Sequence, residues 1–493
     1  MDNTFVEDGG HAGNIQTELE STPLLRSTSV KPKLQRQITL TGAIAMTVST
    51  VIGSGIFVSP NGIVKEVNSV GVSLLIWLGC GLAACAAALC ICELGTAIPS
   101  AGGIYSFILR IYGKLPAFMF IWTFDLISNP AGLAIIHLTL AKYFVVLITD
   151  DPPDWAHKVC AVGFIVCLCA VNCIGVRFMS HVQTFLMFFK LLAILVIVIA
   201  GSIYLGEGNT GYIEHFFTNS TLTPTSFTNA FYTGLWAYNG WDALFHAGEE
   251  MENMATTLPL AIKIGMSIVT LAYLLANIAY MSLLSPFDLI NSKAVAEAAV
   301  TVSLGKVYGN IIIPLFVALS CMGASTGSIF MVGRQVFAAA REGHFPHFLS
   351  LLHPKRNTPI PALVFPCVIA VLLLFLPTSG IEKLIHLSQF TMWIFYGACF
   401  AGIIVLRVRE PDLHRPYKTW IAVPAILTLL SIYLLVTPFI KQPIASVVVV
   451  LIVLASIPVY FLVIVRSCFA EQQLKAVSGF LSRIAQAVCC VTS

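Results

Sequence analysis

The sequence predicts an all-α membrane protein with twelve transmembrane helices in a five-plus-five inverted repeat whose first and sixth spans are broken. Of the 493 residues, 57% are hydrophobic and only 10% are charged, whereas a typical soluble domain has about 25% charged residues. Apolar windows of about 20 residues, the length that crosses a bilayer, recur along the chain. Glycine-rich interruptions fall in the first and sixth windows, five spans apart.

The twelve windows divide the chain into a membrane domain at 39–466, an N-terminal tail at 1–38 and a C-terminal tail at 467–493, and we expect both tails to be cytoplasmic. The first tail lacks the apolar h-region of a signal peptide, so we expect the first span to be retained. In chain order the windows are 41–64, 70–97, 115–148, 158–176, 181–206, 226–248, 259–285, 309–340, 361–377, 384–406, 421–439 and 444–465.

The distribution of lysine and arginine predicts that both tails are cytoplasmic. With that orientation, 19 of the 27 basic residues lie on the cytoplasmic side, 7 lie outside, and Lys190 lies within a span. Cytoplasmic loops of membrane proteins carry such an excess of positive charge.

The first interruption, "VSTVIGSGIFVSP" at 48–60, predicts a helix that unwinds inside the membrane. Glycine exposes backbone groups, which are costly in hydrocarbon unless they are satisfied. A second interruption, "GLWAYNGWDALFHAGEE" at 234–250, lies in the sixth window. Paired interruptions of this kind in two repeats indicate a binding site in a transporter.

The two breaks present complementary backbone groups. A half-helix that starts near Gly55 directs free N–H groups and a positive dipole end at the gap, which suits a carboxylate. Half-helices that end near Val51 and Trp236 leave free carbonyl groups, which suit an ammonium. A ligand with both groups on one carbon is an α-amino acid. The alternative is that these glycines only let helices pack closely.

Ionisable residues within the spans are further candidates, because hydrocarbon makes them costly to keep. Lys190, in "LMFFKLLAIL", lies too deep to reach the membrane surface. Its ammonium is expected to replace a bound cation among backbone carbonyls; proton coupling and a structural ion pair are the alternatives. Asp242 follows the sixth-span break and is expected to line the pocket. Asp125, near Asn129-Pro130, is equally a pocket residue or an internal hydrogen-bond partner.

Three other side chains near the breaks have competing interpretations. His137 and His246 are more typical of hydrogen-bonded bundle residues than of proton relays. Trp236 is equally a lid over the ligand or a packing residue.

Four motifs in order closely resemble the light subunits of heteromeric amino acid transporters, the L-type branch of the amino acid/polyamine/organocation superfamily. They are "TVIGSGIFVSP", "GLWAYNGW" followed by "EE", "AAREGHFPHFLSLLHPKRNTPIPA" and "EPDLHRPYKTW". The resemblance runs from about residue 38 to residue 466 and leaves out both tails.

The resemblance implies a LeuT-type fold and sodium-independent exchange of amino acids by alternating access. It implies that Trp236 and Asn239 complete the ammonium site and cover the substrate from outside, and that Lys190 stands where a sodium site would lie. The backbone that would hold the substrate's carboxylate and ammonium belongs to Val51, Ile52, Gly53, Ser54 and Gly55.

The sequence also departs from this family. Members linked to a heavy subunit carry a cysteine in the outer loop between spans 3 and 4, but the loop here, "LITDDPPDWAHK" at 147–158, has none, and Cys160 is the nearest. We therefore expect solitary function or non-covalent association rather than a disulfide-linked heavy subunit. Met254 stands where the family usually has proline, with no expected functional consequence.

Selectivity is expected to come from the few side chains that face the substrate's side chain. Members that accept anionic substrates have cations in spans 3 and 10, where this chain has Asn129 and Met392. The prediction is exchange of neutral amino acids, including large or aromatic ones. A cationic-plus-neutral exchanger, attracted by Asp242 or Asp125, and an amino acid sensor without flux are the alternatives.

The tails and outer loops contain further motifs. Glu20, Leu24 and Leu25 have the spacing of an acidic dileucine signal for endolysosomal sorting, beside an expected plasma-membrane location. Asn219 begins a glycosylation sequon. The stretch 470–488 is expected to lie on the inner membrane lipid, next to the palmitoylation candidates Cys489 and Cys490, and a cytoplasmic adaptor is conceivable at either tail.

Other classes of protein fit the sequence less well. A channel needs a continuous polar stripe, which the spans lack. There is no HExxH or paired Asp-rich motif, so we expect no enzyme, cofactor or metal. The net charge of +3 is spread over the loops and gives no nucleic-acid footprint. The cysteines lie mostly inside the spans as small packing residues.

Overall fold

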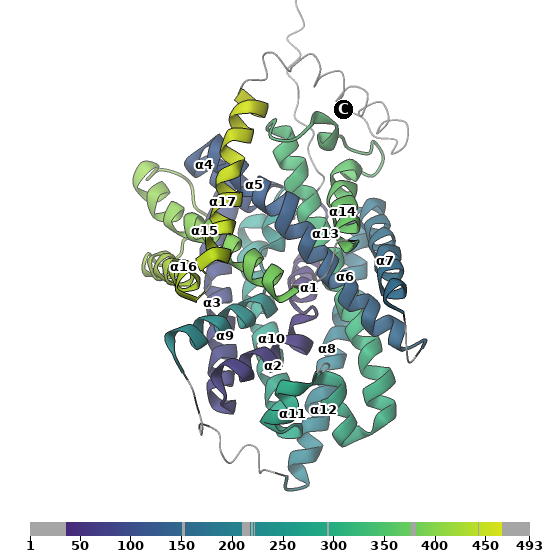
Figure 1. Cartoon of the computed structure of the whole chain (residues 1–493). Helices are drawn as coiled ribbons and strands as arrows, with labels where there is room; N and C mark the ends of the chain where they lie inside the picture. Colours follow the sequence, from purple (N-terminus) through teal and green to yellow (C-terminus); the bar gives the residue numbers. More distant parts are fainter. Residues whose placement is uncertain are drawn as a thin grey trace, which may run out of the picture. The chain divides into compact units, whose positions relative to one another are not determined.

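The chain is helical wherever it enters the apolar windows, because a lipid-exposed backbone must satisfy its hydrogen bonds within its own segment. The computed structural model (Figure 1) describes residues 36–149, 153–209, 217, 220, 222–292, 295–375, 381–441 and 443–465, all within the unit Lys33–Ser493. These residues form no β-strand, only an isolated bridge between Ile38 and Met251. The predicted all-α fold is confirmed.

The first half of the described chain forms the following helices. They are α1 (Leu40–Val51), α2 (Gly55–Val67), α3 (Val70–Ala97), α4 (Ile104–Tyr112), α5 (Lys114–Thr123), the π-helical turn η1 (Phe124–Ser128), α6 (Asn129–Val146), α7 (Asp154–Ile174), α8 (Val176–Gly206), α9 (Pro224–Ala237) and the 3₁₀ turn η2 (Ala243–Ala247).

The second half continues with helices that reach the end of the described residues. They are α10 (Met254–Leu283), α11 (Pro286–Asn291), α12 (Val295–Leu304), η3 (Tyr308–Ile312), α13 (Ile313–Arg341), η4 (His347–Ser350), α14 (Ile360–Leu374), α15 (Ile381–Arg409), α16 (Ala422–Lys441), α17 (Pro443–Val459) and η5 (Tyr460–Val465).

All twelve predicted windows overlap helices, and these helices fall into three groups. Among the described residues, eight helices are long and apolar enough to cross a membrane, and the bent pair α1 and α2 makes a ninth. α14 and the stretch Ser446–Leu462 are apolar but shorter, and the window at 226–248 covers α9 and η2. The multi-pass membrane fold is thereby supported, while the count of twelve crossings stays a prediction.

Both predicted interruptions are present in the structure. α1 and α2 meet at a bend of 45°, with the non-helical residues Ile52–Ser54 between them. α9 ends at Ala237, and the chain resumes as η2 at Ala243. α1 packs against α8, α10 and α13, and α2 packs along α9. The two broken spans therefore lie next to each other inside the bundle.

A π-helical turn between α5 and α6 was not predicted by the sequence analysis. Pro130 has no backbone N–H, so the usual bond to the carbonyl four residues earlier is missing. The chain adapts through η1, which ends immediately before Asn129. Such π-turns inside helices frequently occur at functional sites.

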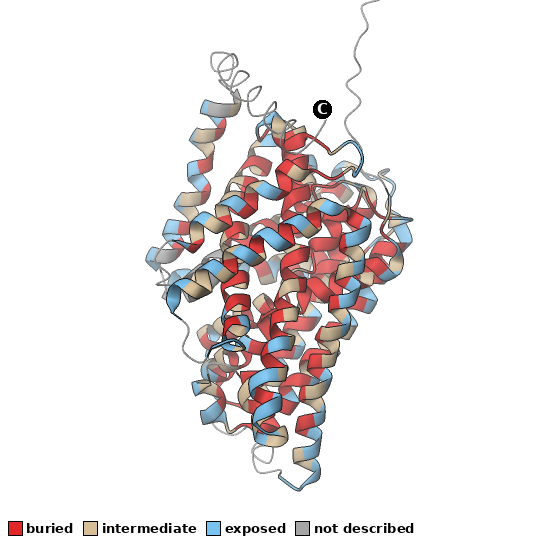
Figure 2. Ribbon diagram, turned by 90° about the vertical axis from the view of Figure 1, so that its right-hand side faces the viewer, coloured by how far each residue is buried: buried red, intermediate tan, exposed pale blue. Residues whose placement is uncertain are grey.

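Burial separates the central helices from the peripheral ones. In the most apolar stretch of each span, 72% of the residues of α13 are buried, whereas the share is 28% in α7 and 28% in α16. Figure 2 shows the buried residues gathered in the interior and the exposed ones on the outer helix faces. α13 is therefore a central helix, while α7 and α16 lie at the periphery.

Ion pairs gather at the end of the bundle where α13 terminates. Arg334 pairs with Glu250 at 2.8 Å, both side chains being 1% exposed, and Arg341 pairs with Glu249 at 2.8 Å. The Glu250 carbonyl also accepts hydrogen bonds from the backbone N–H groups of residues 37 and 38. These contacts join α13, the segment after η2 and the start of α1 into one closed end.

Candidate functional site

The break between α1 and α2 leaves the start of α2 open for a ligand. Ser54 is the N-cap residue of α2, but its side chain makes no capping hydrogen bond. The first N–H groups of a helix have no intrahelical acceptor, and the described residues supply none for Ser54 and Gly55. The site therefore offers backbone donors and the positive end of a helix dipole to an anionic group.

The second break approaches the first through glycine. Gly240 has φ of +99°, and a Cβ there would lie 2.8 Å from Thr50 Cγ2. A Cβ on Gly55 would lie 2.6 Å from the Cα of Ala237. Only glycine permits this backbone contact, which brings the end of α9 against the start of α2.

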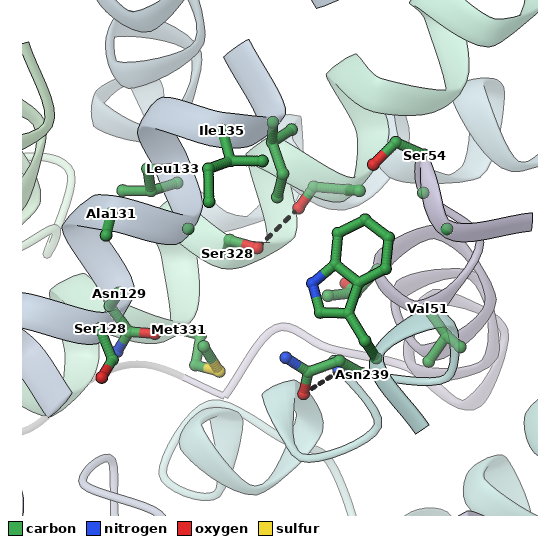
Figure 3. A pocket seen from close by; sticks show the side chains of 18 of the residues that line it. Val51, Ser54, Ser128, Asn129, Ala131, Leu133, Ile135, Asn239, Ser328 and Met331 are labelled. Carbon is green, nitrogen blue, oxygen red and sulfur yellow. Dashed lines mark hydrogen bonds between the residues drawn. The ribbon is translucent and has the colours of Figure 1, made fainter. Parts of the chain in front are cut away.

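A central cavity of about 120 Å³ lies between the two breaks. Its walls come from both broken spans, from η1 and α6, and from α13 and α15. In Figure 3, Val51 and Ser54 lie on one side of it, and Ser128 and Asn129 lie on the opposite side. The lining residues are Thr50, Val51, Gly53, Ser54, Gly55, Ile127, Ser128, Asn129, Ala131, Gly132, Leu133, Ile135, Ile136, Trp236, Ala237, Asn239, Gly240, Ala324, Ser328, Met331 and Met392.

The lining is uncharged: none of the described residues around the central cavity is Asp, Glu, Lys, Arg or His. Its polar side chains are hydroxyls and amides. Ser328 donates to the Ala324 carbonyl at 3.0 Å, a bond that Figure 3 draws. The Asn239 Oδ1 accepts from the Gly240 N–H at 2.9 Å. The cavity can therefore bind backbone charges through dipoles while it surrounds a side chain with neutral groups.

Lys190 lies behind the first break rather than in the central cavity. It projects from α8, is fully buried, and donates to the carbonyl oxygens of Ser49 and Ile52 at the end of α1. Ser320 on α13 also donates to the Ile52 carbonyl at 3.1 Å. The Lys190 amino group thus donates to carbonyl groups that the unwinding of α1 leaves without helical partners.

Tyr273 on α10 connects the two breaks. Its hydroxyl lies 3.0 Å from the Val51 carbonyl oxygen and 2.9 Å from the Ala237 carbonyl oxygen. The side chain is fully buried and packs edge-on against Trp77. Tyr273 therefore holds together the carbonyl groups at the ends of α1 and α9. The sequence analysis did not single out Tyr273.

The structure brings most of the predicted site residues into one place. Those that line the central cavity are Val51, Gly53, Ser54, Gly55, Asn129, Trp236, Asn239 and Met392. Ile52 and Lys190 lie behind it, where they contact each other. Asp242 is also absent from the lining, although it was expected to face the pocket.

The position of Asp242 has a physical explanation. It is the residue before η2 and is 1% exposed, and its Oδ2 accepts a 2.8 Å hydrogen bond from the hydroxyl of Tyr396 on α15. The tight turn therefore directs the carboxylate towards α15 instead of the central cavity. The expectation that Asp242 lines the pocket is corrected accordingly.

Two of the three polar residues that were given two interpretations, Asp125 and His137, also have defined partners. Asp125 accepts from the Asn129 amide at 3.2 Å. His137 contacts the Leu133 carbonyl at 2.7 Å and the Ser325 hydroxyl at 2.9 Å, which joins α6 to α13. No described residue bonds to the His246 ring nitrogens.

Several lining residues escaped the sequence analysis. Ser328 and Met331 come from α13, and Ile135 and Ile136 come from α6. Both helices are apolar and buried on several sides, so no amphipathic pattern marks the face towards the cavity. The signal available in the sequence was the Asn129-Pro130 pair before α6, because a proline inside a span predicts a disturbed helix.

Some predictions fall outside the described residues. These are the sequon at Asn219, the sorting signal at Glu20, Leu24 and Leu25, the amphipathic stretch 470–488 and the cysteines Cys489 and Cys490. They stay predictions.

Comparisons with known proteins show the family of the chain. The amino acid permease family model matches residues 38–465. The mouse b(0,+)-type amino acid transporter 1 is 37% identical over 434 residues, which cover 87% of this chain and 88% of the relative. The human cystine/glutamate transporter is 37% identical over 438 residues, or 88% and 86% of the two chains. The human large neutral amino acids transporter small subunit 2 is 36% identical over 482 residues, or 96% and 89%.

A helical membrane bundle with a cavity between two broken spans defines the class of secondary transporters. Within that class, the chain belongs to the amino acid permease family. Its relatives bear the names of transporters and not of enzymes, so amino acid transport is the function that the family supports.

Proposed function

We propose that this chain is a sodium-independent exchanger of neutral L-amino acids that works by alternating access. The observation that carries the proposal is the central cavity, because it joins the open backbone of two broken helices to a wholly uncharged set of side chains. The first feature suits the charged groups common to all amino acids. The second suits the neutral side chains of some of them.

The backbone groups give the substrate its orientation. The N–H groups of Ser54 and Gly55 receive the α-carboxylate at the positive end of α2. The ends of α1 and α9, near Val51 and Trp236, direct carbonyls and negative dipole ends towards the α-ammonium. Trp236 and Asn239, both in the lining, cover the substrate from the outer side.

Lys190 supports independence from sodium. Its ammonium donates to the Ser49 and Ile52 carbonyls, so it supplies the positive charge that a bound cation would supply there. The carbonyls need no further ion, and exchange needs no sodium gradient.

The substrate class follows from the lining. The three relatives are named for different substrates: cystine and glutamate, large neutral amino acids, and the b(0,+) type. An anionic side chain would need a cation in the cavity, but Asn129 and Met392 are neutral. The buried Asp125 and Asp242 lie outside the lining, which favours neutral over cationic substrates.

The setting of the transporter is also a proposal. The excess of Lys and Arg on one side of the predicted spans favours cytoplasmic termini, and the plasma membrane is the expected location. One relative is named a small subunit, so a larger partner is conceivable here. Since the loop 147–158 has no cysteine, such a partner would associate without a disulfide.

The test is counterflow in proteoliposomes that contain this chain alone. Vesicles are preloaded with unlabelled leucine, phenylalanine, arginine or glutamate, and uptake of labelled leucine is measured with and without sodium. We expect saturable uptake that internal leucine and phenylalanine stimulate and sodium does not change.

Three results would contradict the proposal. Uptake that requires sodium would exclude the role of Lys190, and stimulation by arginine or glutamate alone would exclude the neutral class. Saturable binding of leucine without any flux, also after addition of a heavy subunit, would identify a sensor instead of a transporter.

A further inference from the structure

Asp125 is a carboxylate without an assigned role directly behind the central cavity. It lies on η1, is 0% exposed, and does not belong to the lining. Its Oδ1 accepts a hydrogen bond from the Asn129 Nδ2 at 3.2 Å. Its Oδ2 is buried and has no partner among the described residues. A buried carboxylate inside a membrane bundle is costly and is a functional candidate by default.

The hydrogen bond from Asn129 to Asp125 fixes the orientation of the Asn129 amide. A carboxylate only accepts, so the amide must direct its nitrogen towards Asp125. The same orientation holds if Oδ2 carries a proton, because Oδ1 still accepts. The Asn129 Oδ1 takes no part in this bond, so it is the amide acceptor available to the cavity that Asn129 lines.

The second amide of the cavity has the reverse arrangement. The Asn239 Oδ1 is bound to the Gly240 N–H at 2.9 Å, and its nitrogen contacts the Met392 sulfur at 3.6 Å. Asn239 therefore presents a donor, and Asn129 presents an acceptor. In Figure 3 Asn129 lies on the side opposite Ser54, where the substrate's side chain would end.

We propose that Asp125 is a positioning residue for substrate selection: it holds the Asn129 amide oxygen towards the cavity, so that the site prefers neutral amino acids whose side chain ends in a hydrogen-bond donor. Glutamine is the test case, and methionine is its apolar counterpart of similar length. This inference rests on the proposed function and names its substrate class more narrowly.

The preference has a clear physical basis. The glutamine amide donates to the Asn129 Oδ1, whereas methionine leaves that oxygen without a partner in a water-poor site. Donation of the Asn129 N–H to a carboxylate also polarises the amide and strengthens its oxygen as an acceptor. A substrate carboxylate meets the same oxygen and is repelled.

The experiment compares glutamine with methionine in the counterflow assay. In the wild type we expect kcat/KM for glutamine to exceed that for methionine by about five- to tenfold, the effect of roughly one hydrogen bond. Asp125→Asn should bring this ratio close to one, because an amide at 125 both donates and accepts and lets Asn129 turn over. KM for glutamine should rise while KM and kcat for methionine stay unchanged.

Two further variants keep the proposal falsifiable. Asn129→Leu removes the acceptor from the cavity surface and should abolish the preference even if Asp125→Asn folds poorly. Glu66→Gln is the matched control, because Glu66 accepts from the Asn229 amide at 3.3 Å, outside the central cavity. It should leave the ratio unchanged.

The proposal fails if the wild type does not distinguish the two substrates, or if Asp125→Asn lowers uptake of both equally. A preference for arginine that Asp125→Asn abolishes would also overturn the proposal. The charge of Asp125, and not a hydrogen bond from the substrate to Asn129, would then select the substrate. If the wild type moves no amino acid, the proposed function has failed. The inference is then tested separately by binding. Glutamine should raise the melting temperature of the detergent-solubilised protein more than methionine does, and equal shifts would overturn the inference.

Discussion

Gly55 lies in close contact with Ala237 of the other broken span, so a single added methyl group tests the architecture. In Gly55→Ala the new Cβ would lie 2.6 Å from Ala237 Cα and 2.9 Å from Ala237 Cβ. Backbone on both sides prevents local relaxation, and overpacking costs about 1–3 kcal/mol. We expect uptake to fall by about tenfold or more, because a 1 Å misplacement is enough for such losses.

The control for this substitution is Gly163→Ala on α7. A Cβ at Gly163 meets nothing within 4 Å, and alanine favours a helix over glycine by about 1 kcal/mol. Its uptake should equal that of the wild type. Wild-type uptake by Gly55→Ala itself would show that the close contact is not needed.

Lys190 is the second residue whose role can be isolated. Lys190→Met keeps much of the side chain's volume but leaves the Ser49 and Ile52 carbonyls without their donor. We expect the exchange rate to fall by about tenfold or more, since each unpaired buried group costs about 1–3 kcal/mol. Proteoliposome counterflow measures the rate, and surface expression reports folding.

Lys142→Met on α6 is the matched control, because Lys142 is exposed. It should exchange normally. If Lys190→Met also exchanges at the wild-type rate, Lys190 is only a structural residue.

At the scale of elements, η2 is held to α15 by a buried hydrogen bond. Tyr396→Phe keeps the ring against Trp241, whose centroid is 4.9 Å away, but removes the donor to Asp242. The carboxylate then has no partner, at a cost of about 1–3 kcal/mol. We expect a lower melting temperature in detergent with KM changed by less than about twofold, because Asp242 lies outside the lining.

The matched control for this element is Tyr433→Phe. The Tyr433 hydroxyl donates to the Pro224 carbonyl at 3.0 Å in an exposed setting, so its loss should shift the melting temperature less. A large rise in KM for Tyr396→Phe at an unchanged melting temperature would show that Asp242 takes part in substrate binding after all.

At the scale of the whole molecule, buried charge pairs close the end of the bundle next to Glu249 and Glu250. Glu250→Gln leaves Arg334, which is 0% exposed, with an uncompensated charge. Such losses cost about 3–5 kcal/mol. We expect a clear drop in the melting temperature of the purified protein and easier opening of this end.

The comparison is Glu410→Gln, whose partner Arg110 has a side chain that is 51% exposed. Exposed pairs contribute less than about 1 kcal/mol, so its melting temperature should hardly change. Equal shifts in melting temperature for Glu250→Gln and Glu410→Gln would show that burial does not increase the contribution of the Arg334–Glu250 pair to stability.

The sequence analysis predicted those features that local composition controls. Gly53, Ser54 and Gly55 inside an apolar run could only mean a break or a close contact, and the structure has both. The π-turn η1 was not predicted, and the only sequence signal beside it is the proline of the Asn129-Pro130 pair, which disturbs a helix. The lining residues Ser328 and Met331 could not be predicted, because a helix buried on several sides has no pattern that marks one face.

By itself the sequence determined that the protein is a helical membrane bundle, where its first and sixth spans unwind, and that Lys190 is buried in it. Hydropathy and the cost of exposed backbone in lipid act along the chain and are therefore readable from it. Only the tertiary structure decided that Lys190 meets the end of α1, that Asp242 turns to Tyr396, and that Asp125 holds Asn129. Those contacts depend on side-chain directions between helices far apart in sequence, which no local pattern encodes.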